Sequence, residues 1–446
     1  MRILDGSLLS SLLVGVLGIS SPVHAAPSQR DPAGNWTGQW ERDGSTLDVE
    51  VAFTRAGSGY EGEFSSAQLR VVGIPFTRIR YEEPKLSWDL VGDATTSVFE
   101  GTLRADTLSG TFRDGEATGT FRLTRSKKTI PKLPEEEVTF KNGEVTLAGT
   151  VMYPSGTDSC PGIIFLHGSG SEGRWASRFL ANAFARRGIA ALIYDKRGVG
   201  KSTGNWREIG FTELVKDASA AVEALRAKPR IAKGRVGIHG HSQGGTIAPW
   251  VAAESSHVAF VVASAGAGMS MAETEIYSLG NSVGIRDMTE DERKLADRYI
   301  HTVVATAYKG APRGEMEKAW EEVRDRSWVF PLPADSSFYW AFSRRIDSYD
   351  PLRYWREVSA PALLVYGEND QRVPPRESAA KIAEAYLHAK GTRLDVEIFP
   401  GADHTLRLRP SATQKFEWPK SAPGYPDHMI EWVMQVTNPR LRTEPR

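Results

Sequence analysis

The chain has very little cysteine, since Cys160 is the only one among 446 residues. A lone thiol has no partner within its own chain, so no internal disulfide braces the fold. The stability of the folded chain must therefore come from its buried core. Cys160 lies just before an apolar stretch, and we interpret it as a buried thiol rather than a nucleophile.

The chain also lacks an excess of charge of either sign. Lysine plus arginine and aspartate plus glutamate each number 55. This balance removes the general electrostatic case for binding nucleic acid or an anionic membrane. A small or neutral substrate fits this balance better, and the oligomeric state stays open.

The apolar run at the N-terminus is short, extending from Leu8 to Ile19 before small residues that end at Ala25. With the basic residue ahead of it, this run predicts a signal peptide over residues 1–25, because it is too short to span a bilayer. An uncleaved anchor is the alternative, since Asp5 is unusual in such a leader. We expect a periplasmic or extracellular protein whose mature chain has no membrane span.

Polar and apolar residues alternate over positions 34–125. In "TLDVEVAFT", residues 46–54, every second residue is apolar, and turn pairs such as Asp114-Gly115 separate later runs. A period of two predicts an antiparallel all-β domain of eight or nine short strands, closed as a barrel or a sandwich. The region contains no histidine, metal-ligand spacing or phosphate loop, so we expect no chemistry from it.

Residues 126–137 contain prolines and change from basic to acidic, and we interpret them as a linker. Beyond it, β-rich runs such as "CPGIIFLHG" and "PALLVYGEND" alternate with amphipathic helical patterns. This alternation predicts a doubly wound, mostly parallel α/β sheet over residues 138–440. Ligands bind such sheets at the carboxyl ends of the strands.

The hexapeptide "GHSQGG", residues 240–245, lies between a predicted strand and a predicted helix. In that context G-x-S-x-G forms a nucleophile elbow, a strained turn that presents the serine hydroxyl above the sheet edge. Ser242 is therefore the candidate nucleophile. A serine hydroxyl is a weak nucleophile at neutral pH, so it needs a general base that is held by a third group.

The base follows by elimination among the histidines. On this type of sheet the chain order is serine, acid, histidine, which leaves His388, His404 and His428. His388 and His428 fall in helical patterns, whereas His404 follows a predicted strand and a Pro-Gly turn. A loop at the carboxyl edge is the required place, so we predict His404 as the base.

The acid is expected in "GEND", which follows another predicted strand and offers Glu368 and Asp370. Either carboxylate can accept the Nδ1 proton of a histidine and stabilise the imidazolium. The position within G-x-x-D favours Asp370, and Glu368 stays open.

Two backbone amides are needed for the oxyanion that develops during attack. We predict the amide of Gln243, directly after the nucleophile, and that of Ser169 in "FLHGSGSEG", with Gly168 allowing close approach of the loop. Loss of one such donor costs about 10²–10³ in turnover. The scheme needs no metal and no organic cofactor.

Together these motifs resemble the alpha/beta-hydrolase superfamily in order and spacing, over about residues 136–440. The resemblance implies that Ser242, Asp370 and His404 act as a catalytic triad, and that Gln243 and Ser169 are oxyanion donors. The motifs are "HGSG" (167–170), "YDKRGVGKS" (194–202), "GHSQGG" (240–245), "GENDQRVP" (367–374) and "GADH" (401–404).

Within the superfamily the chain resembles secreted bacterial carboxylesterases, dienelactone-hydrolase-like proteins and prolyl-oligopeptidase-like peptidases. Some carry an N-terminal β domain that begins with G-x-W-x-G, as "GNWTGQW" (34–40) does. Dienelactone hydrolases use a cysteine nucleophile, so Ser242 counts against that activity, and about 90 residues cannot build the propeller of prolyl oligopeptidases. The resemblance implies a serine hydrolase that cleaves carboxylic esters through an acyl-enzyme. A serine peptidase or aminopeptidase, and a binding module centred on the β domain, stay as alternatives.

Residues 269–357 separate two consecutive predicted strands and are mostly helical in pattern, which is typical of a cap over the site. "TEDE", residues 289–292, predicts a capping box at one helix start. Its aromatic residues either line an apolar acyl pocket or pack the cap onto the body. They are Trp320, Trp328, Phe330, Phe338, Tyr339, Trp340, Phe342 and Tyr354. For a peptidase, the carboxylates that would hold a substrate ammonium group are Glu273, Glu275, Glu321 and Glu322.

Overall fold

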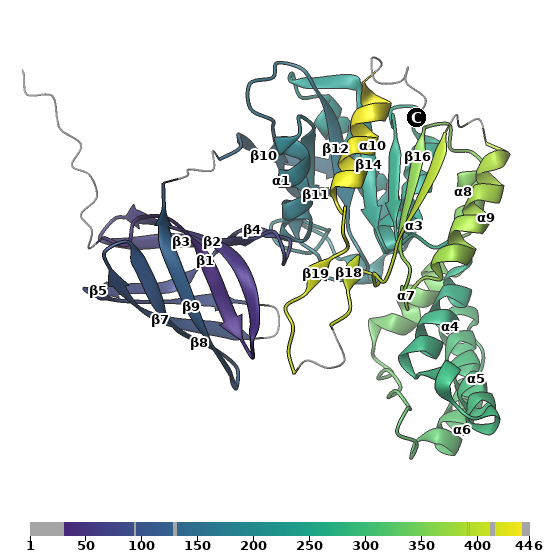
Figure 1. Cartoon of the computed structure of the whole chain (residues 1–446). Coiled ribbons are helices and arrows are strands. Elements are labelled where there is room, and N and C mark those ends of the chain that lie inside the picture. The colour runs from purple at the N-terminus through teal and green to yellow at the C-terminus, as the bar shows by residue number, and fades with distance from the viewer. Residues whose placement is uncertain are drawn as a thin grey trace, which may run out of the picture.

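The computed structural model describes residues 31–92, 95–127, 132–389, 391, 393–410 and 415–438. The expected signal peptide and part of the expected linker lie outside these ranges. An antiparallel β domain precedes a mostly parallel sheet with helices on both faces, which confirms the predicted fold class (Figure 1). Within the described ranges, no helix has the length and apolar character needed to cross a bilayer.

The β domain is one antiparallel sheet in the order β4-β3-β2-β1-β9-β8-β7-β6-β5. Its edge strands are consecutive in the chain, and between them the amide of Phe76 donates to the carbonyl of Gly62 in β3 at 2.8 Å, so the sheet curls back on itself. The alternating apolar residues fill the interior, where Trp36, Trp88 and Phe99 are fully buried. The strands are β1 (Gly34–Arg42), β2 (Ser45–Ala56), β3 (Gly59–Ser66), β4 (Val71–Pro75), β5 (Thr77–Glu82), β6 (Lys85–Val91), β7 (Thr96–Arg104), β8 (Thr107–Asp114) and β9 (Ala117–Ser126).

The second sheet has the order β10-β11-β13-β12-β14-β15-β16-β17. Strand β11 runs antiparallel to both of its neighbours, β10 and β13, and from β13 to β17 the pairs are parallel. The carboxyl ends of the parallel strands therefore meet at one edge. The strands are β10 (Glu135–Asn142), β11 (Val145–Met152), β12 (Cys160–Leu166), β13 (Ala190–Tyr194), β14 (Ile231–His241), β15 (Val261–Ser264), β16 (Ala362–Gly367) and β17 (Leu394–Phe399).

Helices cover both faces of this sheet because its central strands are apolar throughout. Neighbouring residues of β12 enter different cores: Ile163 belongs to the core that includes residues of α1 and α10, and Ile164 to the core that includes residues of α2, α3 and α9. A short hairpin of β18 and β19 lies between β17 and α10. The elements are α1 (Arg178–Arg186), α2 (Phe211–Arg226), α3 (Gln243–Glu254), α9 (Pro375–Leu387), α10 (Asp427–Thr437), β18 (Arg407–Leu408) and β19 (Lys420–Ser421).

The insertion between β15 and β16 is helical, as predicted, and projects from the body of the sheet (Figure 1). Thr289 caps one of its helices by accepting from the amide of Glu292 at 3.4 Å. The reciprocal half of the expected capping box is missing because the Glu292 carboxylate binds Arg326 and Trp328 instead. The helices are α4 (Met271–Ser282), α5 (Glu290–Val304), α6 (Arg313–Val323), α7 (Phe338–Ile346) and α8 (Pro351–Trp355).

Aromatic side chains join this insertion to the body. Phe338 and Phe342 of α7 meet the ring of Trp206 edge-on, with centroids 5.2 and 6.4 Å away. Trp250 of α3 stacks on Tyr354 of α8 at 4.6 Å. These contacts correspond to the packing role considered for the aromatic residues.

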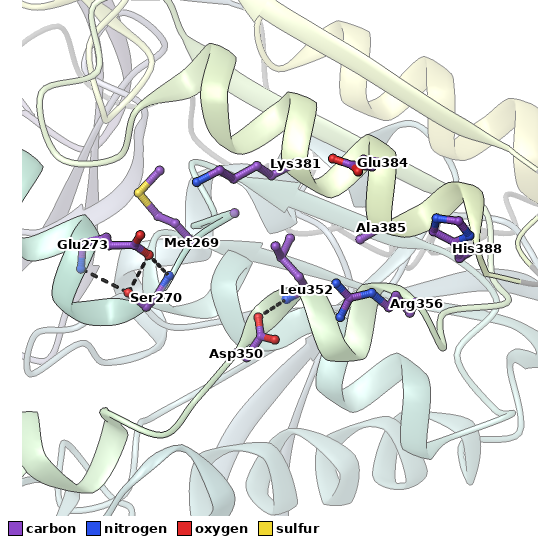
Figure 2. A pocket seen from close by; sticks show the side chains of 11 residues that line it. Met269, Ser270, Glu273, Asp350, Leu352, Arg356, Lys381, Glu384, Ala385 and His388 are labelled. Carbon is purple, nitrogen blue, oxygen red and sulfur yellow. Dashed lines mark hydrogen bonds between the residues drawn. The ribbon is translucent and has the colours of Figure 1, made fainter.

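A groove with a volume of about 450 Å³ lies between the start of α4 and helices α8 and α9 (Figure 2). Glu273, Asp350 and Glu384 face it together with Arg356 and Lys381, so its charge is mixed. No residue predicted for catalysis lines it.

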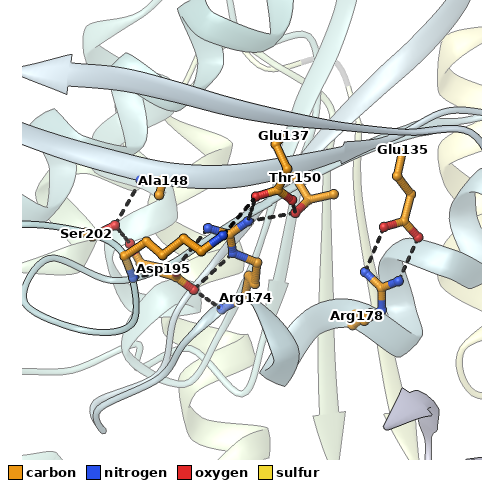
Figure 3. Close-up of polar contacts among 9 residues, drawn as sticks. Glu135, Glu137, Ala148, Thr150, Arg174, Arg178, Asp195 and Ser202 are labelled. Carbon is orange, nitrogen blue, oxygen red and sulfur yellow. Dashed lines mark hydrogen bonds and ion pairs between the residues drawn. The ribbon is translucent and has the colours of Figure 1, made fainter. Parts of the chain in front are cut away.

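A buried ion-pair network is centred on Arg174, which begins a short helical turn after β12 (Figure 3). It joins this turn to β10, β11 and the loop after β13. Arg174 donates to Asp195 at 2.9 Å, to Glu137 at 2.8 Å and to Thr150 at 2.8 Å. Burial alone raises the pKa of Asp195, but hydrogen bonds from Arg174 and from the amide of Lys201 outweigh it and lower that pKa. Folding therefore favours the ionised form of the Asp195 carboxylate.

Replacing Arg174 with methionine leaves the buried Asp195 carboxylate without its cation. We expect Arg174→Met to lower the free energy of unfolding by about 3–5 kcal/mol in urea denaturation near pH 7. The more exposed pair of Arg178 and Glu135 gives the matched control, and Arg178→Met should cost less than about 1 kcal/mol.

The difference in the free energy of unfolding between Arg174→Met and the wild type should become smaller as the pH is lowered. A lowered folded-state pKa stabilises the fold above the unfolded pKa, and that stabilisation is lost as pH falls through the folded value. Urea midpoints measured from pH 7 downward test this, and a difference independent of pH would contradict the role given to Asp195.

Candidate active site

Ser242 occupies a strained turn between β14 and α3. Its backbone has φ 55° and ψ −114°, a region that side-chain-bearing residues rarely adopt. The turn is held on both sides: the Ser242 amide donates to the carbonyl of Ser264 at 2.9 Å, and the Thr246 amide donates to the carbonyl of Ser242 at 2.9 Å. The surrounding hydrogen bonds therefore enforce the elbow expected from the sequence.

Glycines make the turn sterically possible. A Cβ atom on Gly240 would lie 2.2 Å from the carbonyl carbon of Gly244, and one on Gly245 would lie 2.6 Å from the carbonyl oxygen of Ser264. Both contacts are with backbone, which cannot rotate away as a side chain can. Strand β14, helix α3 and strand β15 approach this closely only because those side chains are missing.

The structure brings Ser242, His404 and Asp370 together from three separate loops. His404 Nε2 lies 3.0 Å from Ser242 Oγ, and His404 Nδ1 lies 2.8 Å from Asp370 Oδ2. The Asp370 side chain is fully buried, and its Oδ1 accepts from the amides of Arg372 and Val373. With both oxygens fixed, Asp370 orients the imidazole toward the serine.

The alternatives considered for the acid and the base lie elsewhere. The Glu368 carboxylate accepts from the Gly401 amide and from Arg376, both at 3.1 Å. His388 is at the end of α9, and His428 of α10 lies 3.7 Å from Glu397. None of these three side chains is bonded to Ser242 or His404 in the described part of the chain.

The backbone amides predicted around the oxyanion hole differ in whether they already have a hydrogen-bond partner. Gln243 is the first residue of α3, so its amide has no partner within the helix. The Gly168 amide donates to Glu172 Oε2 at 2.7 Å, so this amide is already bonded within the loop. The amide of exposed Ser169 remains as the candidate in that loop. No sequence pattern indicated the role of Glu172, whose carboxylate folds back onto the loop.

Two histidines near the elbow are held neutral. Burial lowers the pKa of His167 to about 4, and its Nε2 lies 2.6 Å from the Tyr194 carbonyl oxygen, so it anchors the loop after β12. The ring of His241 lies 5.1 Å from that of His404. Burial, followed by the charge of His404, lowers the pKa of His241 well below its usual value. Of these three rings, His404 is the one whose Nε2 lies 3.0 Å from Ser242 Oγ.

The β domain contacts the loop between β17 and β18 that carries His404, which we call the histidine loop. Arg70, in the turn between β3 and β4, donates to the carbonyl of Thr405 at 2.6 Å, and Arg407 donates to the carbonyl of Leu69 at 3.1 Å. The guanidinium of Arg70 also stacks 5.3 Å from the ring centre of Tyr425. Neighbours of His404 are thus held from outside the hydrolase domain, a contact that no sequence motif indicates.

The four carboxylates considered for a substrate ammonium group do not act as one set. Glu273 caps α4 by accepting from Ser270, while Glu321 and Glu322 pair with Arg324 and Arg298. Glu275 alone faces the inside of the insertion, 3.3 Å from the hydroxyl of Tyr339, and burial raises its pKa. Across the described residues, no three histidine, cysteine, aspartate or glutamate side chains gather to hold a metal ion.

A sequence profile of the alpha/beta hydrolase family matches residues 163–414, which is more than half of the chain and includes the elbow, the acid loop and the histidine loop. The chain belongs to the alpha/beta hydrolase family. The strand order and the strained serine turn of this hydrolase agree with that membership.

This alpha/beta hydrolase is similar to several named proteins. It is 26% identical over 254 residues to the bifunctional esterase/perhydrolase DCH of Acinetobacter calcoaceticus, which covers 56% of this chain and 87% of that protein. It is 22% identical over 297 residues to esterase EstD of Thermotoga maritima, covering 64% of each. The solved structure of hypothetical protein PA2218 from Pseudomonas aeruginosa has 22% identity, covers 70% of this chain and 97% of that one, and gives a TM-score of 0.41.

Adding a methyl group at Gly240 forces the elbow apart. We expect Gly240→Ala to destabilise the hydrolase by at least about 1–3 kcal/mol in urea denaturation and to abolish labelling of Ser242 by a fluorophosphonate. Gly234 of the same strand is the control, because its Cβ meets nothing within 4 Å. Gly234→Ala should keep stability within about 0.5 kcal/mol and retain labelling.

Removing Arg70 frees one side of the histidine loop. We expect Arg70→Ala to lower kcat for the best available ester about 10-fold while KM changes little, because a small displacement of His404 weakens proton transfer. Arg113, an exposed arginine of β8, is the control. Equal kinetics of Arg70→Ala and Arg113→Ala would show that the β domain does not influence the histidine loop.

Proposed function

We propose that this protein is a serine hydrolase that cleaves carboxylic esters, with Ser242 as nucleophile, His404 as general base and acid, and Asp370 as the group that orients the histidine. The carrying observation is the unbroken hydrogen-bond line from Ser242 Oγ through the imidazole to Asp370, at 3.0 and 2.8 Å. Such a line is the requirement for activating a serine hydroxyl near neutral pH.

In the first half-reaction, Ser242 Oγ attacks the ester carbonyl carbon while its proton passes to His404 Nε2. The tetrahedral intermediate collapses when His404 returns that proton to the leaving oxygen, so an alcohol departs and an acyl-serine remains. The Asp370 carboxylate accepts from Nδ1 and stabilises the imidazolium. In the second half, His404 takes a proton from water, the hydroxide attacks the acyl carbon, and the acid is released as Ser242 regains its proton.

The negative charge on the intermediate requires donors at the elbow. We assign this role to the amide of Gln243, which begins α3 with the positive end of the helix dipole, and to the amide of Ser169. Gly168 is left out because Glu172 takes its amide.

Esters are favoured over peptides on two grounds. Relatives that are similar over more than half of this chain carry the name esterase. In addition, Glu273, Glu321 and Glu322 are bound to partners of their own, which leaves an aminopeptidase without a carboxylate cluster for the substrate ammonium group. We also propose export through the signal peptide at residues 1–25.

A plate assay of the purified chain tests the proposal. We expect turnover of short p-nitrophenyl esters, little turnover of aminoacyl anilides, and loss of ester turnover by about 10³-fold or more in Ser242→Ala. Ser219→Ala is the matched control, since Ser219 lies on α2, where its hydroxyl donates to the Val215 carbonyl of the same helix. It should retain wild-type turnover.

The other outcomes are equally informative. Anilide turnover that disappears in Ser242→Ala would replace the esterase assignment with a peptidase. Ester turnover that is equal in wild type and Ser242→Ala would remove Ser242 as the nucleophile. If neither substrate series reacts and a fluorophosphonate leaves Ser242 unlabelled, the proposed hydrolase mechanism is wrong.

A further inference from the structure

Lys196 is a buried lysine to which no carboxylate of the described residues is hydrogen-bonded. It follows β13 directly, and 1% of it is exposed. Its ammonium donates to the carbonyl oxygens of Gly168 at 2.7 Å and Gly170 at 3.1 Å, and to Oε1 of Gln243 at 2.9 Å. An ammonium has three hydrogens, so each of them is used.

The three acceptors lie on both sides of the proposed oxyanion hole. Gly168 and Gly170 flank Ser169, and Gln243 carries the other proposed donor amide. Lys196 therefore joins the loop after β12 to the first residue of α3. The backbone of Lys196 also binds this loop, since the Lys196 amide donates to the Glu172 carbonyl at 3.2 Å.

We propose that Lys196 is a positioning residue that fixes the Ser169 amide relative to the Gln243 amide, and whose charge favours the oxyanion. This inference rests on the proposed function. The mechanism through the triad does not use Lys196, and a single ammonium that holds both donor segments accounts for its three bonds.

Burying the Lys196 ammonium costs hydration free energy, and an apolar side chain would pack the same space without that cost. An ammonium taken out of water loses several kcal/mol of hydration. The ring of Trp206, 4.9 Å away, recovers part of it through a cation-π contact. Since Phe338 and Phe342 of α7 pack on the same ring, the helical insertion supports Lys196 from the outside.

The charged groups around Lys196 are otherwise engaged. The charge of Glu172 acts on Lys196, and the Glu172 carboxylate accepts from the Gly168 amide. His167 is neutral at physiological pH, Asp195 is paired with Arg174, and Asp217 is paired with Arg197. The charge of Glu172 therefore compensates that of Lys196 only in part, and no carboxylate of the described residues pairs with the ammonium directly.

The buried environment of Lys196 gives the site a group that loses its proton in the alkaline range. Burial lowers the pKa of Lys196 to about 8, and the charge of Glu172 opposes the shift only in part. Above that pH the amine has two hydrogens for three acceptors and no charge, so kcat should fall. The fold behaves in the opposite way: between about pH 8 and the ordinary lysine value the unfolded chain binds more protons, so this group makes stability rise with pH.

The experiment compares kcat and KM for the best p-nitrophenyl ester from pH 6 to 10 in wild type, Lys196→Met, Lys196→Arg and Lys201→Met. Lys201 is the matched control because it lies in the same loop, 77% exposed, 3.8 Å from Glu137. We expect Lys196→Met to lower kcat about 10–100-fold with KM within two-fold and without the alkaline decrease near pH 8. Lys201→Met should follow the wild-type profile.

Lys196→Arg tests whether charge and donors are the essential properties. Arginine keeps its proton above pH 12, so any activity it restores over methionine should persist at pH 9–10 where the wild type declines. A thermal unfolding midpoint for each variant separates a positioning effect from loss of the fold. A Lys196→Met variant with wild-type kcat and the same alkaline decrease would overturn the proposal.

The rate of Ser242 labelling by a fluorophosphonate gives a readout that needs no ester. A wild-type chain that is not labelled would refute the proposed function itself, and the role of Lys196 with it. Labelling that is equally fast in wild type and a folded Lys196→Met would refute the role of Lys196 alone. We expect labelling to be slower in Lys196→Met by about the same factor as kcat.

Discussion

The close approach of three backbone segments at the elbow is the constraint on which the rest of the site depends. Gly240 and Gly245 let β14, α3 and β15 meet without side chains between them, and Gly244 lets α3 approach the end of β12. Hydrogen bonds with Ser264 and Thr246 hold Ser242 at a positive φ. This conformation places the hydroxyl beside His404 and directs the first amides of α3 to the same side. The strained turn thus positions both the nucleophile and a donor for the charge it generates.

Charge in the interior is concentrated next to that turn. Asp195, Lys196 and Arg197 are consecutive and buried, although each is ionisable. Arg174 pairs with Asp195 and Asp217 with Arg197, so two of the three are neutralised, and the middle one bonds to carbonyl oxygens. The ion pairs fix the ends of this segment, and Lys196 is the member whose charge points to the site.

Local patterns predicted the parts of the molecule that depend on local chemistry. Strand-helix alternation gave the sheet, and the motifs around Ser242, Asp370 and His404 gave three side chains that the structure brings into contact. The bonds of Lys196 were not predictable because its acceptors are mainly carbonyl groups, which every residue has. Capture of the Gly168 amide by Glu172 depends on a loop conformation that no spacing specifies.

The contacts between the β domain and the histidine loop have a consequence for the order of folding. Arg70 and Thr405 are 335 residues apart, and Trp418 reaches Ser45 across 373. Contacts of such long separation form late, since a large loop must close before they stabilise anything. During synthesis the β strands emerge first, yet the segments they bind are among the last to appear. The histidine therefore reaches its final position only when the chain is nearly complete, so a truncated or partly folded chain carries the serine without its base.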